Sequence, residues 1–246
     1  MQTENLALPD GRRLAYARTP GAGPGVTFLG GFRSDMTGTK ATFLEAWARS
    51  RGRAFLRFDY TGHGASSGAF EAGAIGDWAR DAADALEALT EGPQVLVGSS
   101  MGGWIALLLA RRLPERVAGI VGVAAAPDFT EDGMWDAFDA GQRETLLRDG
   151  RIETPSEYAA DPYVITRRLI EEGRDNLVLR TPLRLAAPLR LLHGTADADV
   201  AASVALRLLA HAEGPDVRLT LVRGADHRFS TPEALDLIAR TVEDLG

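Results

Sequence analysis

Apolar, strand-like runs alternate with amphipathic helical segments along most of this 246-residue chain. The runs 25–32, 54–60, 94–98, 117–126 and 189–194 are nearly continuous in apolar residues instead of alternating with polar ones. Strands have this composition when both of their faces are buried, as in a mostly parallel sheet that is covered by helices on both sides. The sequence therefore predicts an α/β fold.

Two other segments refine this prediction. Residues 6–18 form two short alternating runs around a Pro-Asp-Gly turn, which is typical of a β-hairpin. Residues 75–89 have the spacing of an amphipathic helix. Five of its apolar side chains are expected near one face: Trp78, Ala82, Ala85, Leu86 and Leu89.

The alternation of strand-like and helical segments is interrupted between Pro127 and Pro188. Residues 133–150 and 163–173 are predicted to be helices, and no strong strand pattern lies between them. The strand and helix alternation resumes after Pro188. We therefore expect a single domain over residues 1–246, with a helical cap inserted at about 128–187.

Composition excludes several classes of protein. The formal net charge of −7 argues against nonspecific binding to nucleic acid or to anionic membranes. Cysteine is absent, so disulfides, a thiol nucleophile and cysteine metal sites are excluded. We find neither a signal peptide nor an apolar run of membrane-spanning length, so we expect a cytoplasmic protein without stable membrane insertion. Lys40 is the only lysine, which we interpret as genomic base composition.

Residues 98–102 read Gly-Ser-Ser-Met-Gly and match the nucleophile-elbow pattern G-x-S-x-G. A serine on such a sharp strand-to-helix turn has strained backbone angles, and side chains two residues away would collide with the strand or the helix. Only Ser100 has glycine at both positions, because Ser99 has Val97 and Met101 there. The turn also aims the N–H of Met101 at the site. We predict that Ser100 is a nucleophile and not merely a helix cap.

A serine hydroxyl needs a neighbouring base, and the chain has four histidines. His227 lies in the loop between the last expected strand and the last expected helix, at the sheet edge where α/β folds place their chemistry. His63 lies between two glycines, His193 ends a strand where it is expected to serve the turn, and His211 falls near a helix end. We therefore predict that His227 is the base.

A carboxylate must orient this base and stabilise its imidazolium. Asp197 and Asp199 follow the expected strand 189–194, and Asp128 follows the strand that ends at Ala126. The residues alone leave all three as candidates, and each is also compatible with a solvated loop acid or a helix cap. For each of the three the chain order would be serine, aspartate, histidine, the order that accompanies this elbow.

With these motifs, the chain resembles the Ser-His-Asp enzymes of the α/β-hydrolase superfamily over nearly its whole length. The superfamily pattern H-G-x-x-D-x-x-V matches residues 193–200 and implies that Asp197 is the acid. The pattern D-x-x-G-x-G-x-S matches residues 59–66, a loop that is structural in the superfamily, which argues against His63 as the base. The resemblance implies a mostly parallel eight-stranded sheet with helices on both faces and a helical cap.

A narrower resemblance rests on "SDMTGTKA", "RFDYTGHGASSG", "GPQVLVGSSMGGW", "RLLHGTADADV" and "DHRF". These segments are similar to the palmitoyl-protein thioesterase family that also hydrolyses acyl glucuronides, and imply a bacterial-type relative without a transit peptide. The family resemblance implies that the backbone N–H groups of Phe32 and Met101 form the oxyanion hole. Gly-Gly replaces the His-Gly of the wider superfamily here, which changes the rim of the hole and keeps its backbone donors.

The implied activity is hydrolysis of carboxylic esters or thioesters, of small molecules or acyl-proteins, without cofactor or metal. Arg33 and Arg228 are candidates for contact with an anionic leaving group, although an arginine at such a position is more often exposed on the surface or salt-bridged. Apolar residues of the expected cap are candidates for an acyl pocket, or for packing the cap on the body. These are Met134, Trp135, Phe138, Leu146, Leu147, Tyr158 and Tyr163.

Other functions remain possible at this point. Gly62, Gly64 and Gly68 resemble a dinucleotide fingerprint, but residues 69–73 do not open the apolar helix that such a site requires. A hydrolase fold without catalysis, acting as a ligand-binding or interaction module, is a second alternative. Peptidase, perhydrolase and carbon–carbon bond hydrolase activities also fit the same motifs.

Overall fold

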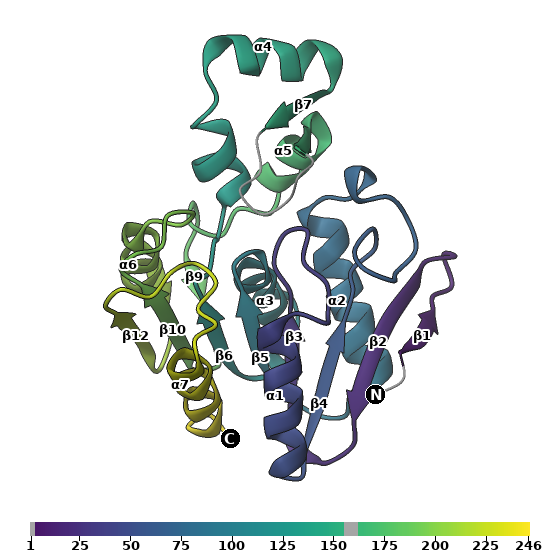
Figure 1. The fold of residues 1–246 in the computed structure, drawn as a ribbon, viewed down its shortest axis with the longest axis vertical. Helices are drawn as coiled ribbons and strands as arrows, with labels where there is room; N and C mark the ends of the chain where they lie inside the picture. Colours follow the sequence, from purple (N-terminus) through teal and green to yellow (C-terminus); the bar gives the residue numbers. More distant parts are fainter. Residues whose placement is uncertain (1–2, 155–161) are drawn as a thin grey trace.

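The computed structural model describes residues 3–154 and 162–246, and eight of its strands form one sheet in the order β1-β2-β4-β3-β5-β6-β10-β12. β1 and β2 form the expected antiparallel hairpin, and β2 is also antiparallel to β4. All later neighbours in this sheet are parallel. The predicted sheet is therefore confirmed (Figure 1). Its strands are β1 Glu4–Ala7, β2 Arg13–Thr19, β3 Ala22–Leu29, β4 Arg53–Phe58, β5 Gln94–Ser99, β6 Val117–Val123, β10 Leu189–Gly194 and β12 Val217–Val222.

Helices cover both faces of this sheet, and the side chains of β5 show why its sequence is continuously apolar. Val95 and Val97 join the core beneath α1 and α7, whereas Leu96 joins the core beneath α2 and α3. Successive side chains of a strand point to opposite faces, so a strand buried on both faces has no polar positions to spare. The main helices are α1 Thr39–Ser50, α2 Ile75–Leu89, α3 Met101–Arg112, α6 Ala202–His211 and α7 Pro232–Glu243 (Figure 1).

The amphipathic pattern of residues 75–89 is confirmed as α2, which packs on α3. All five apolar side chains expected on its inner face are buried. Its Trp78 also donates a hydrogen bond from Nε1 to the carbonyl of Thr61 at 3.1 Å, so the indole has a partner for its one polar group.

Residues 130–154 and 162–174, between β6 and β10, rise beyond the carboxyl ends of the strands (Figure 1). The expectation that this part of the chain lacks strands is wrong, because Tyr163–Thr166 forms β8 and pairs with β7. Tyr-Val-Ile-Thr is composed of strand-favouring residues, and the Thr166 hydroxyl then caps the helix that follows. We call residues 130–154 and 162–174 the cap; its elements are η3 Thr130–Trp135, a π-helical turn, α4 Ala140–Asp149, β7 Arg151–Thr154, β8 Tyr163–Thr166 and α5 Arg167–Arg174.

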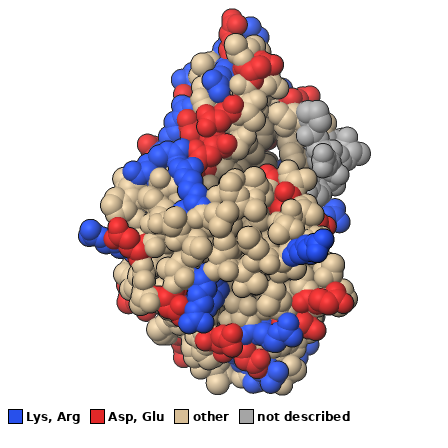
Figure 2. Space-filling view, turned by 90° about the vertical axis from the view of Figure 1, so that its left-hand side faces the viewer, with Lys and Arg blue, Asp and Glu red and all other residues tan. Residues whose placement is uncertain are grey.

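Short elements complete the described chain. They are η1 Phe70–Ala72, η2 Pro114–Arg116, and the paired strands β9 Leu183–Arg184 and β11 Ala212–Glu213. Acidic and basic side chains stand beside one another on the face shown in Figure 2, most densely on the cap and around the lower end of the body. No helix in the described part of the chain is both long and apolar enough to cross a membrane.

Candidate active site

Ser100 lies on the turn between the end of β5 and the start of α3, with a φ of 53°. Its N–H donates to the carbonyl of Val123 at 2.9 Å, and its own carbonyl accepts from the N–H groups of Gly103 and Ala126. A positive φ is uncommon for a residue with a side chain and persists where surrounding contacts enforce it. The turn is therefore a fixed feature of the fold and not a flexible glycine-rich connector.

The two glycines that flank Ser100 are required by close backbone approaches. A Cβ on Gly98 would lie 2.3 Å from the carbonyl oxygen of Gly102. A Cβ on Gly102 would lie 2.0 Å from the carbonyl oxygen of Leu29, in the neighbouring strand β3. Both distances are far below van der Waals contact, so the spacing that singled out Ser100 in the sequence has this steric origin.

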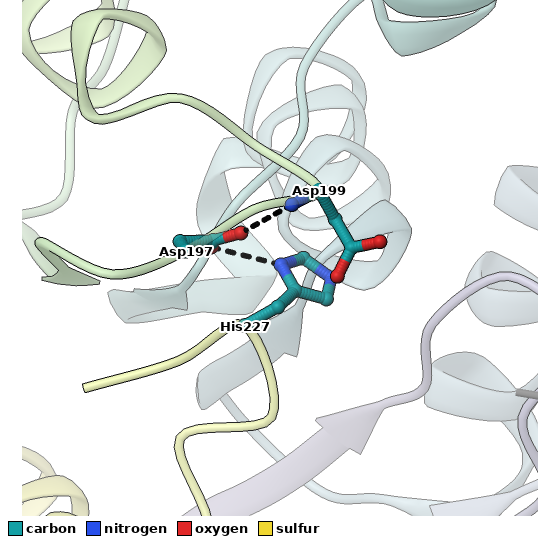
Figure 3. A group of neighbouring side chains, drawn as sticks. All are labelled: Asp197, Asp199 and His227. Carbon is teal, nitrogen blue, oxygen red and sulfur yellow. Dashed lines mark hydrogen bonds and ion pairs between the residues drawn. The ribbon is translucent and has the colours of Figure 1, made fainter. Parts of the chain in front are cut away.

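His227 and Asp197 meet at the carboxyl edge of the sheet, on the loops that follow β12 and β10 (Figure 3). His227 Nδ1 lies 2.9 Å from Asp197 Oδ2. The Asp197 side chain is fully buried, and its Oδ1 accepts the N–H groups of Asp199 and Val200. Burial favours the neutral acid, but the hydrogen bonds from His227 and Val200 outweigh it, and the pKa of Asp197 lies below its ordinary value.

This arrangement fixes the tautomer of His227. An ionised carboxylate only accepts hydrogen bonds, so Nδ1 of His227 must carry the proton that it donates to Asp197. The neutral ring then has its lone pair on Nε2, where it can accept a proton from a hydroxyl group.

Ser100 and His227 line the same cavity, which has a volume of about 470 Å³. Phe32 also lines it, and its ring packs edge to face on Phe70 and Phe129. Arg33 and Arg228, the two arginines singled out in the sequence, also line this cavity, as do the cap residues Met134 and Tyr163. The elbow, the base loop, the loop after β3 and the cap therefore enclose one space.

The two residues expected to supply an oxyanion hole, Phe32 and Met101, belong to the loop after β3 and to the start of α3. Met101 is the first residue of α3, and the N–H of a first helical residue has no acceptor within its helix. Phe32 follows Gly31, where a Cβ would lie 3.6 Å from the Cβ of Ser100 and 3.5 Å from the carbonyl oxygen of Ser99. The loop after β3 therefore passes directly beside the elbow.

His193 and His211 each make a hydrogen bond that holds the local backbone. His193 is buried and donates from Nε2 to the carbonyl of Val200 at 2.8 Å, which holds the turn that carries Asp197. His211 donates from Nε2 to the carbonyl of Thr181 at 2.8 Å, near the carboxyl end of α6. Neither residue lines the cavity.

The structure places Asp128, the third candidate acid, away from His227. It is fully buried with a φ of 58°, and accepts the N–H groups of Val178 and Leu179 at 2.8 and 3.0 Å. Burial raises the pKa of its carboxyl against these hydrogen bonds. Asp128 therefore joins the chain that leaves β6 to the chain that returns from the cap.

The glycine-rich loop 59–66 folds around a buried carboxylate and not around a ligand. Asp59 accepts the N–H groups of Met36 and Ala65 at 2.7 and 2.9 Å. A Cβ on Gly64 would lie 2.1 Å from Asp59 Oδ2, and one on Gly62 would lie 2.7 Å from the backbone of Phe70. These glycines have positive φ and allow close packing, which removes the support for a dinucleotide fingerprint.

The structure does not bring Trp135 and Phe138 to the cavity. Trp135 is instead stacked by the guanidinium groups of Arg143 and Arg174, at 5.0 and 4.7 Å from its ring. Phe138 is buried in the core of the cap, as is Leu146, whereas Leu147 is exposed. Tyr158 lies outside the described residues.

Lys40 also lines the cavity, and the sequence reasoning missed it. Its side chain donates a hydrogen bond from Nζ to the carbonyl of Arg228, next to His227. The signal that could have identified it is that it is the only lysine in a chain otherwise supplied with arginine.

Asp197, Asp199 and His227 offer oxygen and nitrogen atoms that all lie within 4.8 Å of one another, a set that could hold a metal ion. Figure 3 shows the Asp199 carboxylate beside the imidazole ring, on the side away from Asp197. The buried Asp197, however, already accepts two backbone N–H groups and the ring N–H of His227. Its oxygens are therefore used by the protein itself.

This fold is that of the alpha/beta hydrolases. A family model for the alpha/beta hydrolase family matches residues 20–241, and the chain belongs to that family. It is 36% identical to the mitochondrial palmitoyl-protein thioesterase ABHD10 of Rattus norvegicus, over 98% of this chain and 81% of that protein. The corresponding protein of Bos taurus is also 36% identical, over 98% of this chain and 78% of its own. The chain is thus a homologue of the ABHD10 thioesterases.

Two solved structures agree with this relationship. A hydrolase from Agrobacterium vitis S4 superposes with a TM-score of 0.94 at 40% identity, covering 100% of this chain and 99% of that one. The alpha/beta hydrolase domain-containing protein 10 from mouse superposes with a TM-score of 0.92 at 33% identity, covering 100% of this chain and 98% of that one. Both likenesses extend over the whole described fold.

Proposed function

We propose that this protein hydrolyses carboxylic esters or thioesters through a covalent acyl-enzyme on Ser100. The observation that carries the proposal is the shared cavity: a serine at a positive φ faces the same space as His227, whose Nδ1 is bonded to the buried Asp197. Similarity to palmitoyl-protein thioesterases supports an acyl substrate.

In this mechanism His227 Nε2 removes the proton of the Ser100 hydroxyl as the oxygen attacks the carbonyl carbon. Asp197 keeps the ring in the required tautomer and stabilises the imidazolium that forms. The N–H groups of Phe32 and Met101 donate to the oxyanion, and loss of one such donor costs about 3–4 kcal/mol in the transition state. The imidazolium then protonates the departing alcohol or thiol, and water repeats the sequence to release the acid.

A panel of substrates tests this function. We expect the purified protein to hydrolyse p-nitrophenyl esters of graded chain length and acyl-coenzyme A thioesters, and Ser100→Ala or His227→Ala to lower kcat by roughly 10⁴–10⁶ without unfolding the protein. An acyl glucuronide in the same panel compares a third leaving group. A folded wild type without activity on every ester and thioester would contradict the proposal.

A further inference from the structure

Lys40 is a cation built into the wall of the cavity. It is the second residue of α1, and it lines the space shared by Ser100 and His227. Its Nζ donates to the carbonyl of Arg228. The ammonium group therefore lies between the start of a helix and the loop that carries the candidate base.

A positive charge is unfavourable at this place. The first turn of a helix has a positive electrostatic potential, which disfavours a cation. Burial and the charge of Arg228 lower the pKa of Lys40 to about 8, against the attraction of Asp226. A neutral amide could donate the same hydrogen bond to a carbonyl, so the contact with Arg228 does not by itself require an ammonium group.

Arg33 and Lys40 contact groups other than carboxylates. Many arginines outside the cavity pair with carboxylates, as Arg180 and Arg207 do with Asp132, and both signs intermingle on the face in Figure 2. Arg33 instead stacks on two rings and donates to a carbonyl. In the described part of the chain, neither Arg33 nor Lys40 forms an ion pair with a carboxylate.

The described residues that line the cavity thus include three cations, Arg33, Lys40 and Arg228, and one carboxylate, Asp199. The chain as a whole carries a formal net charge of −7, so the surplus of positive charge is local. A concave, partly buried surface of one sign attracts ligands of the opposite sign. A cavity of about 470 Å³ also keeps any such group close to the scissile carbonyl.

We infer that Lys40 is a specificity-determining residue that binds a carboxylate group on the ester or thioester substrate. This inference rests on the proposed function and narrows its substrates to anionic esters and thioesters. Lys40 acts as a point charge, which tolerates variation in the position of the carboxylate, and Arg33 in the same cavity adds a second positive charge.

Two matched substrate pairs test the inference and locate the carboxylate. Mono-p-nitrophenyl adipate against p-nitrophenyl hexanoate places the charge on the acyl side. The ester 4-acetoxybenzoate against methyl 4-acetoxybenzoate places it on the leaving group. We expect wild type to prefer the anionic member by about tenfold in kcat/KM in at least one pair, a typical effect of one charged contact.

Variants separate the charge of Lys40 from its structural contact. Lys40→Met should reduce the preference to about threefold or less, chiefly through KM for the anionic ester, whereas Lys40→Arg should keep it. Arg111→Met is the matched control, because Arg111 is exposed near the far end of α3, on the order of 15 Å along the helix from Met101. An equal loss in the methionine and arginine variants of Lys40 would assign the residue a structural role only and overturn the inference.

The single lysine permits a direct readout of its protonation. An amine-selective reagent can modify only Lys40 and the terminal amine, and peptide mass spectrometry distinguishes the two. We expect the rate of Lys40 modification to rise with pH, with a midpoint near pH 8. Free adipate or 4-hydroxybenzoate should slow the modification. The preference in kcat/KM for the anionic ester should fall over the same pH range. The charges of Asp226 and Arg228 act on this ammonium, and the other titratable or charged groups that line the cavity are His227, Asp199 and Arg33.

The outcomes distinguish this inference from the proposed function. Hydrolysis of the neutral esters without any preference for anionic ones would overturn the role of Lys40 and leave the proposed function standing. A folded wild type that hydrolyses neither member of either pair would overturn both.

Discussion

Ser100 depends on two neighbours that have no side chain. Gly102 is the more constrained of them, because its Cα faces the carbonyl oxygen of Leu29 across the junction of β3 and α3. We predict that Gly102→Ala lowers the free energy of unfolding by about 1–3 kcal/mol, as overpacking does. It should also lower kcat/KM at least about 100-fold, because a displaced elbow misplaces the nucleophile. Urea denaturation and ester hydrolysis measure the two effects.

Gly141→Ala is the matched control for this substitution. Gly141 lies in the first turn of α4, and a Cβ there would lie 3.4 Å from its nearest neighbour, Asp139 Oδ1. Alanine favours helix, so this variant should be as stable as wild type or up to about 1 kcal/mol more stable. If the two alanine variants behave alike, the steric account of the elbow is wrong.

Asp197 and Asp128 offer a comparison between two buried carboxylates with different partners. Asp197→Asn should lower kcat about 10⁴-fold, because an amide at this position favours the wrong tautomer of His227. Asp128→Asn should leave kcat within about tenfold of wild type and reduce stability by about 1–3 kcal/mol, because one buried N–H of Val178 or Leu179 loses its acceptor.

Steady-state kinetics and thermal denaturation of both variants check this pair. A loss of activity in the asparagine variant of Asp128, with normal activity in that of Asp197, would reverse the assignment of the acid.

At the scale of elements, the sequence predicted those segments whose local pattern and tertiary surroundings agree. α2 was predicted at its observed bounds, Ile75–Leu89, because its apolar stripe packs directly on α3. β8 was mistaken for part of a helix, because four residues are too few for periodicity to separate a strand from a helix, and its partner β7 lies elsewhere in the chain. Phe138 was left between the acyl pocket and the packing of the cap for a related reason: the sequence shows that a residue is apolar but not which space it fills.

His63 lies in the loop 59–66 and has a structural role. Its ring packs on Tyr60, Phe70 and Trp78, and Nδ1 donates to the carbonyl of Thr61. Its buried Nε2 has no hydrogen-bond partner among the described residues. Burial lowers the pKa of His63 to about 4, so the folded protein keeps this ring neutral.

This depressed pKa predicts a pH dependence of stability. The unfolded chain binds a proton at His63 near pH 6.5, whereas the folded chain does so only near pH 4. The stability associated with a neutral His63 is therefore complete above pH 6.5 and is lost as pH falls toward 4, by about 2–3 kcal/mol. His63→Phe should have a shallower decline, and Trp78 Nε1 still donates to the Thr61 carbonyl in that variant. Urea denaturation of both proteins at pH 7, 5.5 and 4.5 measures the free energy of unfolding. An equal decline in the wild type and in His63→Phe would refute the assignment of this pH dependence to His63.

At the scale of the whole molecule, the parallel sheet collects distant parts of the chain at one edge. Ser100, Asp197 and His227 follow β5, β10 and β12, so their approach depends on topology that a motif search can infer only by resemblance. The sequence therefore predicted these residues as candidates, and the fold determines how close they come to one another. Lys40 was missed because nothing in the local sequence of α1 indicates that its first turn faces the loop of His227.

Labelling with a fluorophosphonate probe measures directly whether Ser100 is an activated nucleophile. We predict that the wild type is labelled on the peptide that contains Ser100. Ser99→Ala, in the adjacent residue, should keep its label, whereas Ser100→Ala and His227→Ala should lose nearly all of it. A folded wild type that is not labelled, or a Ser100→Ala variant that is labelled as fast as wild type, would contradict the assignment of Ser100 as the nucleophile.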